Sequence, residues 1–433
     1  MSSGVTYREI FKAWWPLAAS WLLMSAELPA ISAVIARLTD PTVNLAAYGS
    51  VVFPLAILIE APVIMLLAAS TALSKDWATY TTLRRYVRWL GASLTLVHIL
   101  IAFTPVFDWI VISVISAPPE VLEPSRIGLM IMTPWTWSIA YRRFNQGVLI
   151  RFGQSKAVSL GTVVRLAADV TVLAVGYWVG SIAGIVVATC AVSAGVIFEA
   201  LFVGLRVRPV LAGDLRDAPP ANEAVNLRSF AAFYVPLALT SLLNLAIQPV
   251  SSAALSRMPQ PLESLAVWPV VYGLFFMLRC LGHAYQEVAV ALLDKPGAHV
   301  QLRRFALTQG SSTTLMLALI ALTPLSRIWF VDVSGLNEEL AGLAGTAIWF
   351  GLLLPALSAL LNWFQGILVH ARKTRGITES VFVFLVACSI GLWIGVMWGG
   401  MPGIFIGLAS YSVGGLFQLS WVRWKGSGVL PKD

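Results

Sequence analysis

The sequence predicts an all-α membrane protein of twelve transmembrane helices, arranged as two pseudo-symmetric six-helix bundles. Hydrophobic residues make up 58% of the 433 positions and charged residues only 12%, whereas a soluble domain carries about 25% charged residues. Lipid admits only helices and closed barrels as spanning structures, and barrel strands read as alternating segments of about ten residues. The unbroken apolar runs at 311–325 and 377–397 therefore favour helices. The chain also repeats itself at mid-length, which divides the helices into two sets of six.

Apolar stretches of about 20 residues, the length that crosses a bilayer, occur twelve times along the chain. The expected spans are 13–36, 43–73, 86–104, 127–150, 157–177, 182–205, 230–255, 263–293, 305–323, 340–369, 377–397 and 402–422. The second, eighth and tenth exceed a minimal span, so we expect those helices to tilt or bend. The first is too long for a cleavable signal segment, and we expect it to be retained.

The distribution of Lys and Arg predicts the orientation. Of the 29 basic residues, 21 fall in segments that an N-inside start places in the cytoplasm, as the positive-inside rule requires. The outside segments hold only Arg37, Arg126, Arg257 and Arg327. We therefore expect both termini in the cytoplasm. The net charge of +8 is explained by this orientation signal, and no aromatic-interleaved basic patch points to a nucleic acid.

The two halves of the chain align at an offset of 219 to 220 residues. Matching segments include Arg84-Arg85 with Arg303-Arg304, Thr104-Pro105 with Thr323-Pro324, and Gly184-Ile185 with Gly403-Ile404. We expect an N-terminal lobe over 1–206, a cytoplasmic linker over 207–226 and a C-terminal lobe over 227–433. Six crossings return the chain to its starting side, so an axis along the membrane normal relates the lobes, as in known transporters. Such a duplication indicates a substrate path between two lobes that open by alternating access.

Motifs for catalysis or cofactor binding are missing from the sequence. Cys190, Cys280 and Cys388 stand alone in apolar segments, which indicates neither a disulfide framework nor a metal site. The chain has no Walker phosphate loop, no HExxH and no GxSxG. We therefore expect no cofactor, no metal and no enzymatic activity, with a membrane-embedded enzyme as the alternative of another class.

Three segments resemble a known transporter superfamily. Trp15-Pro16-Leu17 with Leu45-Ala46-Ala47-Tyr48-Gly49 resembles the first two helices of the progressive ankylosis (ANK) family. The run 233–239 followed by Gln248-Pro249-Val250 resembles the start of its second half. Asn145 to Arg151 lies where ANK proteins and multidrug and toxic-compound extruders (MATE) carry a helix end before a basic loop. The chain is thus similar to the superfamily of MATE, polysaccharide-flippase and ANK proteins.

This resemblance implies a V-shaped pair of six-helix bundles around a central cavity. ANK proteins are associated with export of organic and phosphate-bearing anions, and MATE proteins with cation efflux coupled to Na⁺ or H⁺. MATE antiporters often carry an acidic residue in the first helix, where this chain has Glu27.

Ionisable residues inside the expected spans are candidates for the functional site, because each costs about 2.5–3.5 kcal/mol at the bilayer centre. Glu60 and Arg279 occupy equivalent positions at an offset of 219. We hypothesise that they form an inter-lobe ion pair that closes one face of the cavity; the alternative is that each pairs within its own lobe. Arg165 and Asp169, four residues apart, are interpreted as a local pair on one helix face.

Three further residues are candidates for ion coupling. Glu27 lies in a helix softened by Pro29 and is the first candidate. His283 and Glu287 are one turn apart and offer a site for a proton or cation, since imidazole titrates near neutrality. A packed polar pair is the alternative for these two.

Substrate contact is expected from arginines and amides. Arg142 and Arg143 are adjacent and therefore point in different directions, so we expect one to line the cavity and the other to reach the cytoplasmic surface. Guanidinium groups suit carboxylate and phosphate, and Arg279 belongs to the same set. Gln146, Asn244 and Gln248 are candidates for polar lining, with interhelical hydrogen bonding as the alternative.

The leading hypothesis is a secondary transporter that exports an organic or phosphate-bearing anion by alternating access. Na⁺- or H⁺-coupled multidrug efflux of the MATE type and a lipid-linked saccharide flippase are the alternatives within the same fold. Expected partners are membrane lipid and a small-molecule or lipid-linked substrate, with coupling to Na⁺ or H⁺ left open. We expect a monomer in a bacterial inner membrane.

Overall fold

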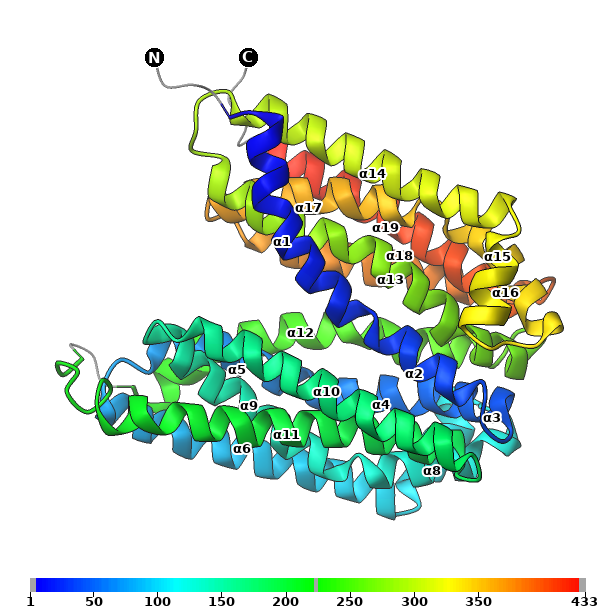
Figure 1. Cartoon of the computed structure of the whole chain (residues 1–433), viewed down its shortest axis with the longest axis horizontal. Coiled ribbons are helices and arrows are strands. Elements are labelled where there is room, and N and C mark those ends of the chain that lie inside the picture. The colour runs from blue at the N-terminus through cyan, green and yellow to red at the C-terminus, as the bar shows by residue number, and fades with distance from the viewer. Residues whose placement is uncertain (1–4, 222–224, 428–433) are drawn as a thin grey trace. The chain divides into compact units, whose positions relative to one another are not determined.

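The computed structural model describes residues 5–221 and 225–427, and the ordered elements in these ranges are helices (Figure 1). Ten of them are long and apolar enough to cross a membrane, or eleven if the bent pair α16 (Glu338–Gly351) and α17 (Leu354–His370) counts as one span. The chain is thus an integral membrane protein with the predicted all-α architecture. The expected span at 127–150 corresponds to α8 (Pro119–Ile131) and α9 (Thr133–Arg151). Its three arginines make α9 too polar for an apolar span.

Contacts divide the chain into two compact units. The first, called the N unit, comprises Arg37–Pro249, and the second, called the C unit, comprises Met1–Ala36 with Val250–Asp433. The N unit holds α3 (Pro41–Ala46), η1 (Ala47–Val52), α4 (Phe53–Ile64), α5 (Leu66–Leu73), α6 (Trp77–Phe103), α7 (Val106–Asp108), η2 (Trp109–Ile115), α8, α9, α10 (Ser155–Val179), α11 (Gly184–Ala212) and the first part of α12 (Leu227–Leu255). The C unit holds α1 (Tyr7–Ser25), α2 (Glu27–Ile35), the end of α12, α13 (Pro261–Leu292), α14 (Ala298–Leu322), α15 (Leu325–Arg327), η3 (Ile328–Val333), α16, α17, α18 (Arg375–Trp398) and α19 (Gly403–Ser427).

Each unit contains a helix from the other half of the sequence. In the C unit, α1 packs along α13 (Figure 1), where the indole N–H of Trp14 donates to the Leu281 carbonyl at 3.0 Å. In the N unit, the hydroxyl of Tyr234 on α12 donates to the carbonyl of Pro62. These units therefore differ from the expected lobes 1–206 and 227–433 by an exchange of first helices.

The internal repeat is visible in the backbone. Left-handed residues occur in pairs at the predicted offset: Asp40 with Gln260, Ser116 with Gly335, Gly153 with Arg372, and Gly180 with Gly399. Thr104 and Thr323, which end α6 and α14, have nearly identical torsion angles, φ −121° with ψ 169° and φ −121° with ψ 168°. Left-handed backbone is rare outside glycine, so its recurrence at equivalent positions reflects one ancestral fold used twice.

Two of the three long spans are interrupted, and one of these two bends. The stretch 41–73 is broken into α3, η1, α4 and α5, with Pro54 and Pro62 inside the broken region. The pair α16 and α17 bends by 41°, whereas α13 continues through Pro269 to Leu292. π-helical segments and prolines are the usual causes of such breaks.

The linker after α11 is tied to the N unit. Asp76 caps α6 by accepting from the Thr79 backbone N–H at 2.8 Å, and it also accepts from the Ala221 N–H at 2.9 Å. Burial works to raise the pKa of Asp76, but these hydrogen bonds outweigh it and hold the pKa below its usual value. The Arg216 guanidinium lies 4.9 Å from the Trp77 ring centroid. The first part of the linker is thus anchored at the start of α6.

Candidate functional site

The interior of the N unit contains a buried ion pair between α9 and α11. Arg142 and Glu199 are both buried and form a salt bridge. The Gln146 amide donates to the second Glu199 oxygen at 2.9 Å. One helical turn separates Arg142 from Gln146, so both face α11. Arg142 and Gln146, predicted to contact substrate, are therefore engaged with Glu199.

Glu60 and Arg143 lie beside this pair. Glu60 on α4 is 1% exposed and lies within electrostatic reach of Arg142 and Arg143. One of its oxygens has no hydrogen-bond partner among the described residues. Among the residues that the structure describes, no carboxylate lies within ion-pair distance of the half-buried Arg143 guanidinium. Of the two adjacent arginines, Arg142 is thus paired with a carboxylate, and a role of Arg143 in ligand binding stays a prediction.

Arg165 and Asp169 on α10 face a glycine of α11. A Cβ atom at Gly195 would lie 1.8 Å from the Asp169 Oδ1 and 3.0 Å from the Arg165 Cγ. The missing side chain therefore makes room for both. The local pairing of Arg165 with Asp169 stays a prediction. The three acids Glu60, Asp169 and Glu199 match the three arginines 142, 143 and 165 in number, so this cluster carries no net charge when all six are ionised.

In the C unit, Arg279 on α13 lies among polar and apolar side chains, and no acid lines its cavity. It lines a small cavity of about 20 Å³ together with Ser358, Tyr411 and Gln418. The Ser358 hydroxyl donates to the Arg279 carbonyl at 3.2 Å. Within 5–221 and 225–427, no carboxylate lies within ion-pair distance of the half-buried guanidinium.

His283 and Glu287 have separate partners. The His283 Nδ1 lies 3.2 Å from the Asn362 side-chain oxygen, and Glu287 accepts from the Trp21 indole N–H at 3.3 Å. The Trp21 ring also lies 5.5 Å from the His283 ring. Both residues thus anchor neighbouring helices of the C unit, and their role in ion binding stays a prediction.

The remaining candidates lie on α2 and α12. Glu27 is half-buried at the first position of α2, just after the break that separates it from α1. On α12, Asn244 is exposed and Gln248 is half-buried. The hypothesised pair of Glu60 with Arg279 joins residues of different units and stays a prediction.

Glu199 is a buried charged residue that is not among the predicted site residues. The signal was present, because Glu199 is the only acid in the expected span 182–205. Its partner is 57 residues away, however, and only the packing of α9 against α11 brings the two together.

Solved structures of transporters share this arrangement of helices. An inward-facing multidrug resistance MATE family transporter of the MOP superfamily matches with a TM-score of 0.76 and 15% identity, over 95% of this chain and 98% of that one. The chain has the MATE fold. The lipid II flippase MurJ in an inward closed conformation matches with a TM-score of 0.63 and 12% identity, over 94% of this chain and 87% of that one.

A third solved structure with a similar fold is described by the polarity of its own binding pocket. A MOP superfamily transporter from Pyrococcus furiosus Vc1, for which a reverse polarity of the binding pocket suggests a different function, matches with a TM-score of 0.58 and 16% identity, over 98% of this chain and 97% of that one. No family model and no curated protein matches the sequence. At these identities the likeness establishes the fold, and the substrate has to be argued from this chain's own residues.

Proposed function

We propose that this MATE-fold chain is a secondary transporter that exports an organic or phosphate-bearing anion by alternating access. The observation that carries the proposal is Arg279, a guanidinium in the C unit with no carboxylate in ion-pair distance among the described residues. Arg143 offers a second such group in the N unit. The sequence resemblance to ANK proteins supports the same substrate class.

An intramembrane arginine requires a compensating charge or a polar path. Placing it in a helix centre costs about 2.5–3.5 kcal/mol on insertion scales, and arginine stays charged in proteins. Arg142 meets this requirement through Glu199. Arg279 has hydroxyl, amide and apolar neighbours in its cavity and no acid among them. The cavity of about 20 Å³ has room for about one water, so it has to widen before a carboxylate or phosphate supplies the missing countercharge with bidentate geometry.

The direction of export in this proposal follows from the membrane potential of a bacterial cell. An inside-negative membrane potential drives an anion outward by about 2.3 kcal/mol per elementary charge per 100 mV. Export of an anion therefore needs no coupled cation. In this proposal the acids of the N unit balance the arginines and help to switch between states.

Cation-coupled drug efflux is the second candidate, and Glu60 favours it. A fully buried carboxylate with one oxygen lacking a hydrogen-bond partner is suited to binding a proton or a small cation. In that case removal of the Glu60 charge abolishes transport of a cationic dye and leaves anions unaffected.

Flux measurements in proteoliposomes distinguish anion export from cation-coupled drug efflux. With an imposed potential, we expect the full chain to move citrate or ATP and not a cationic dye. Arg279→Gln should lower the anion flux about tenfold or more, because a charged hydrogen bond is worth roughly 1.5–3 kcal/mol, and Arg279→Lys should restore part of it. Arg304→Gln, which removes an exposed arginine of the same unit, should change nothing. Dye transport that needs Glu60, without anion flux, would overturn the proposal.

A further inference from the structure

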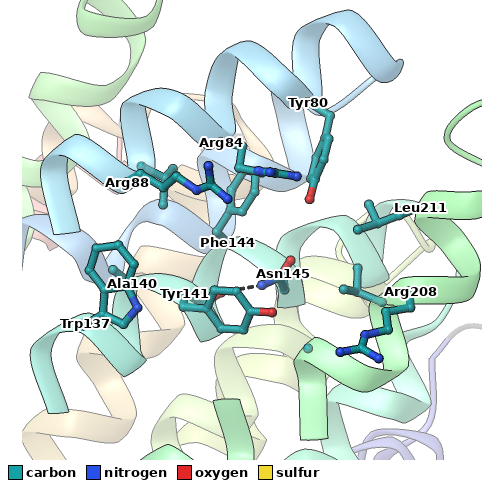
Figure 2. Close-up of a pocket in the computed structure, with 13 residues that line it drawn as sticks. Tyr80, Arg84, Arg88, Trp137, Ala140, Tyr141, Phe144, Asn145, Arg208 and Leu211 are labelled. Carbon is teal, nitrogen blue, oxygen red and sulfur yellow. Dashed lines mark hydrogen bonds between the residues drawn. The ribbon is translucent and has the colours of Figure 1, made fainter. Parts of the chain in front are cut away.

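A basic cavity lies between α6, α9 and α11 of the N unit, and neither Arg142 nor Glu199 lines it. It has a volume of about 340 Å³ and is lined by Arg84, Arg88 and Arg208, together with Tyr80, Tyr141 and Asn145 among others. Figure 2 shows the arginines on α6 and α11 around the cavity, with Tyr141 and Asn145 of α9 between them. No acid lines this cavity, and among the described residues none of its three arginines forms an ion pair.

The C unit carries an equivalent cavity between the equivalent helices. It has a volume of about 540 Å³, lies between α14, α17 and α19, and is lined by His299, Arg303 and Arg423 among others. Arg303 is the repeat partner of Arg84, and His299 is the repeat partner of Tyr80. On α19, the helix equivalent to α11, the basic residue is Arg423. The repeat partner of Arg208 is Ser427, which lines the same cavity. Both repeats thus keep a cavity with at least two arginines and no acid, although the lining residues have changed.

Apolar side chains lie next to the first cavity on the same two helices. Trp89 on α6 is 73% exposed, and Leu201 and Leu205 on α11 are 59% and 57% exposed. In a membrane protein such residues face acyl chains. Trp137 and Tyr141, which line the cavity, are each 42% exposed, and such amphipathic rings favour the level of the lipid headgroups. The cavity is thus open where polar and apolar surfaces meet.

We propose that each of these two cavities binds the phosphate headgroup of an anionic phospholipid from the cytoplasmic leaflet. Guanidinium groups bind phosphate with bidentate hydrogen bonds, and basic pockets between transmembrane helices on the cytoplasmic side bind anionic lipid headgroups. The basic helix ends that form the cavities belong to the segments that the positive-inside pattern places in the cytoplasm. Volumes of about 340 and 540 Å³ fall in or near the range of small-ligand sites, about 300–1,000 Å³.

Binding of lipids to the detergent-solubilised full chain tests the proposal. Native mass spectrometry with short-chain phosphatidylglycerol and phosphatidylcholine should resolve two phosphatidylglycerol molecules that bind more tightly than phosphatidylcholine. The variant Arg84→Gln/Arg88→Gln should lose one of them, with affinity about fivefold weaker for each arginine removed. Arg303→Gln/Arg423→Gln should lose the other.

The repeat supplies matched controls. Arg85 and Arg304 are the exposed neighbours of Arg84 and Arg303 on the same helices, and neither lines either of these two cavities. Arg85→Gln/Arg304→Gln should leave both phosphatidylglycerol molecules bound. Equal loss in this control would show diffuse attraction to the basic surface and would overturn the proposal.

A second arm distinguishes the lipid from a soluble phosphate ester. Glycerol 3-phosphate carries the same phosphate without acyl chains, so at equal concentration it should fail to displace phosphatidylglycerol. Displacement by glycerol 3-phosphate, or equal affinity for phosphatidylcholine, would overturn the assignment to an anionic lipid. Arg84→Lys, which keeps the charge but loses the bidentate geometry, should bind phosphatidylglycerol more tightly than Arg84→Gln, and equal affinity of the two variants would also contradict the proposal.

Discussion

Removal of Glu199 leaves the Arg142 guanidinium without its carboxylate in the interior of the N unit. Breaking a buried ion pair by deleting one partner costs about 3–5 kcal/mol, whereas replacing both by apolar residues is often neutral. We therefore expect Glu199→Ala to lower the free energy of unfolding by several kcal/mol, and Arg142→Met/Glu199→Leu to recover most of that loss. Equilibrium unfolding in mixed micelles measures both.

The control for this prediction is an acid with no such partner. Glu120 on α8 is exposed, so Glu120→Ala should change the free energy of unfolding by no more than about 0.5 kcal/mol. If Glu199→Ala is no more harmful than Glu120→Ala, the buried pair does not stabilise the N unit.

Turns between elements differ in how well their residues suit the backbone. Ser116 holds φ +59°, and its repeat partner Gly335 holds φ +77°. A side chain in left-handed backbone costs about 1–2 kcal/mol. Glycine removes this cost, but it also raises the conformational entropy of the unfolded chain, which offsets part of the gain in stability. Ser116→Gly should therefore raise the free energy of unfolding by about 0.5–1 kcal/mol. Ser334→Gly, at φ −84°, should lower it, and a gain there would contradict the backbone argument.

Much at the element scale could be predicted from the sequence. The apolar runs and the repeat predicted the helical fold and a two-fold reuse of one bundle, because both depend on local pattern. Pro41 and Pro261, or Gly180 and Gly399, mark equivalent helix ends in sequence as well as in structure. The left-handed Ser116 and the break between α8 and α9 have no local signal, since neighbouring helices impose them.

The candidate site was predicted less well, for a reason of distance. The intramembrane charges stood out because each is costly in lipid. Which of them pair depends on how helices rotate and pack, and Arg142 meets an acid 57 residues away. The sequence identified the charged residues, but it could not show that Arg142 pairs with a carboxylate and that Arg143 has none within ion-pair distance among the described residues.

At the scale of the whole molecule, the exchange of first helices predicts that the two halves stay together when the linker is cut. Trp14 of α1 packs against Phe305 in the C unit, with ring centroids 5.4 Å apart. In the N unit, Tyr234 of α12 donates to the Pro62 carbonyl, and Phe230 of the same helix packs against Tyr86 of α6. A protease site inserted between the linker residues Asp217 and Ala218 should give two fragments that co-elute in size-exclusion chromatography, because each compact unit contains residues of both fragments.

Trp14→Ala and Tyr234→Ala should each release part of the cleaved protein, since loss of a packed aromatic side chain costs about 3–5 kcal/mol. Trp89→Ala, which removes a ring that is 73% exposed, should release none. Fragments that separate without any substitution would show that the lobes 1–206 and 227–433 are independent, and that the exchanged helices do not hold the molecule together.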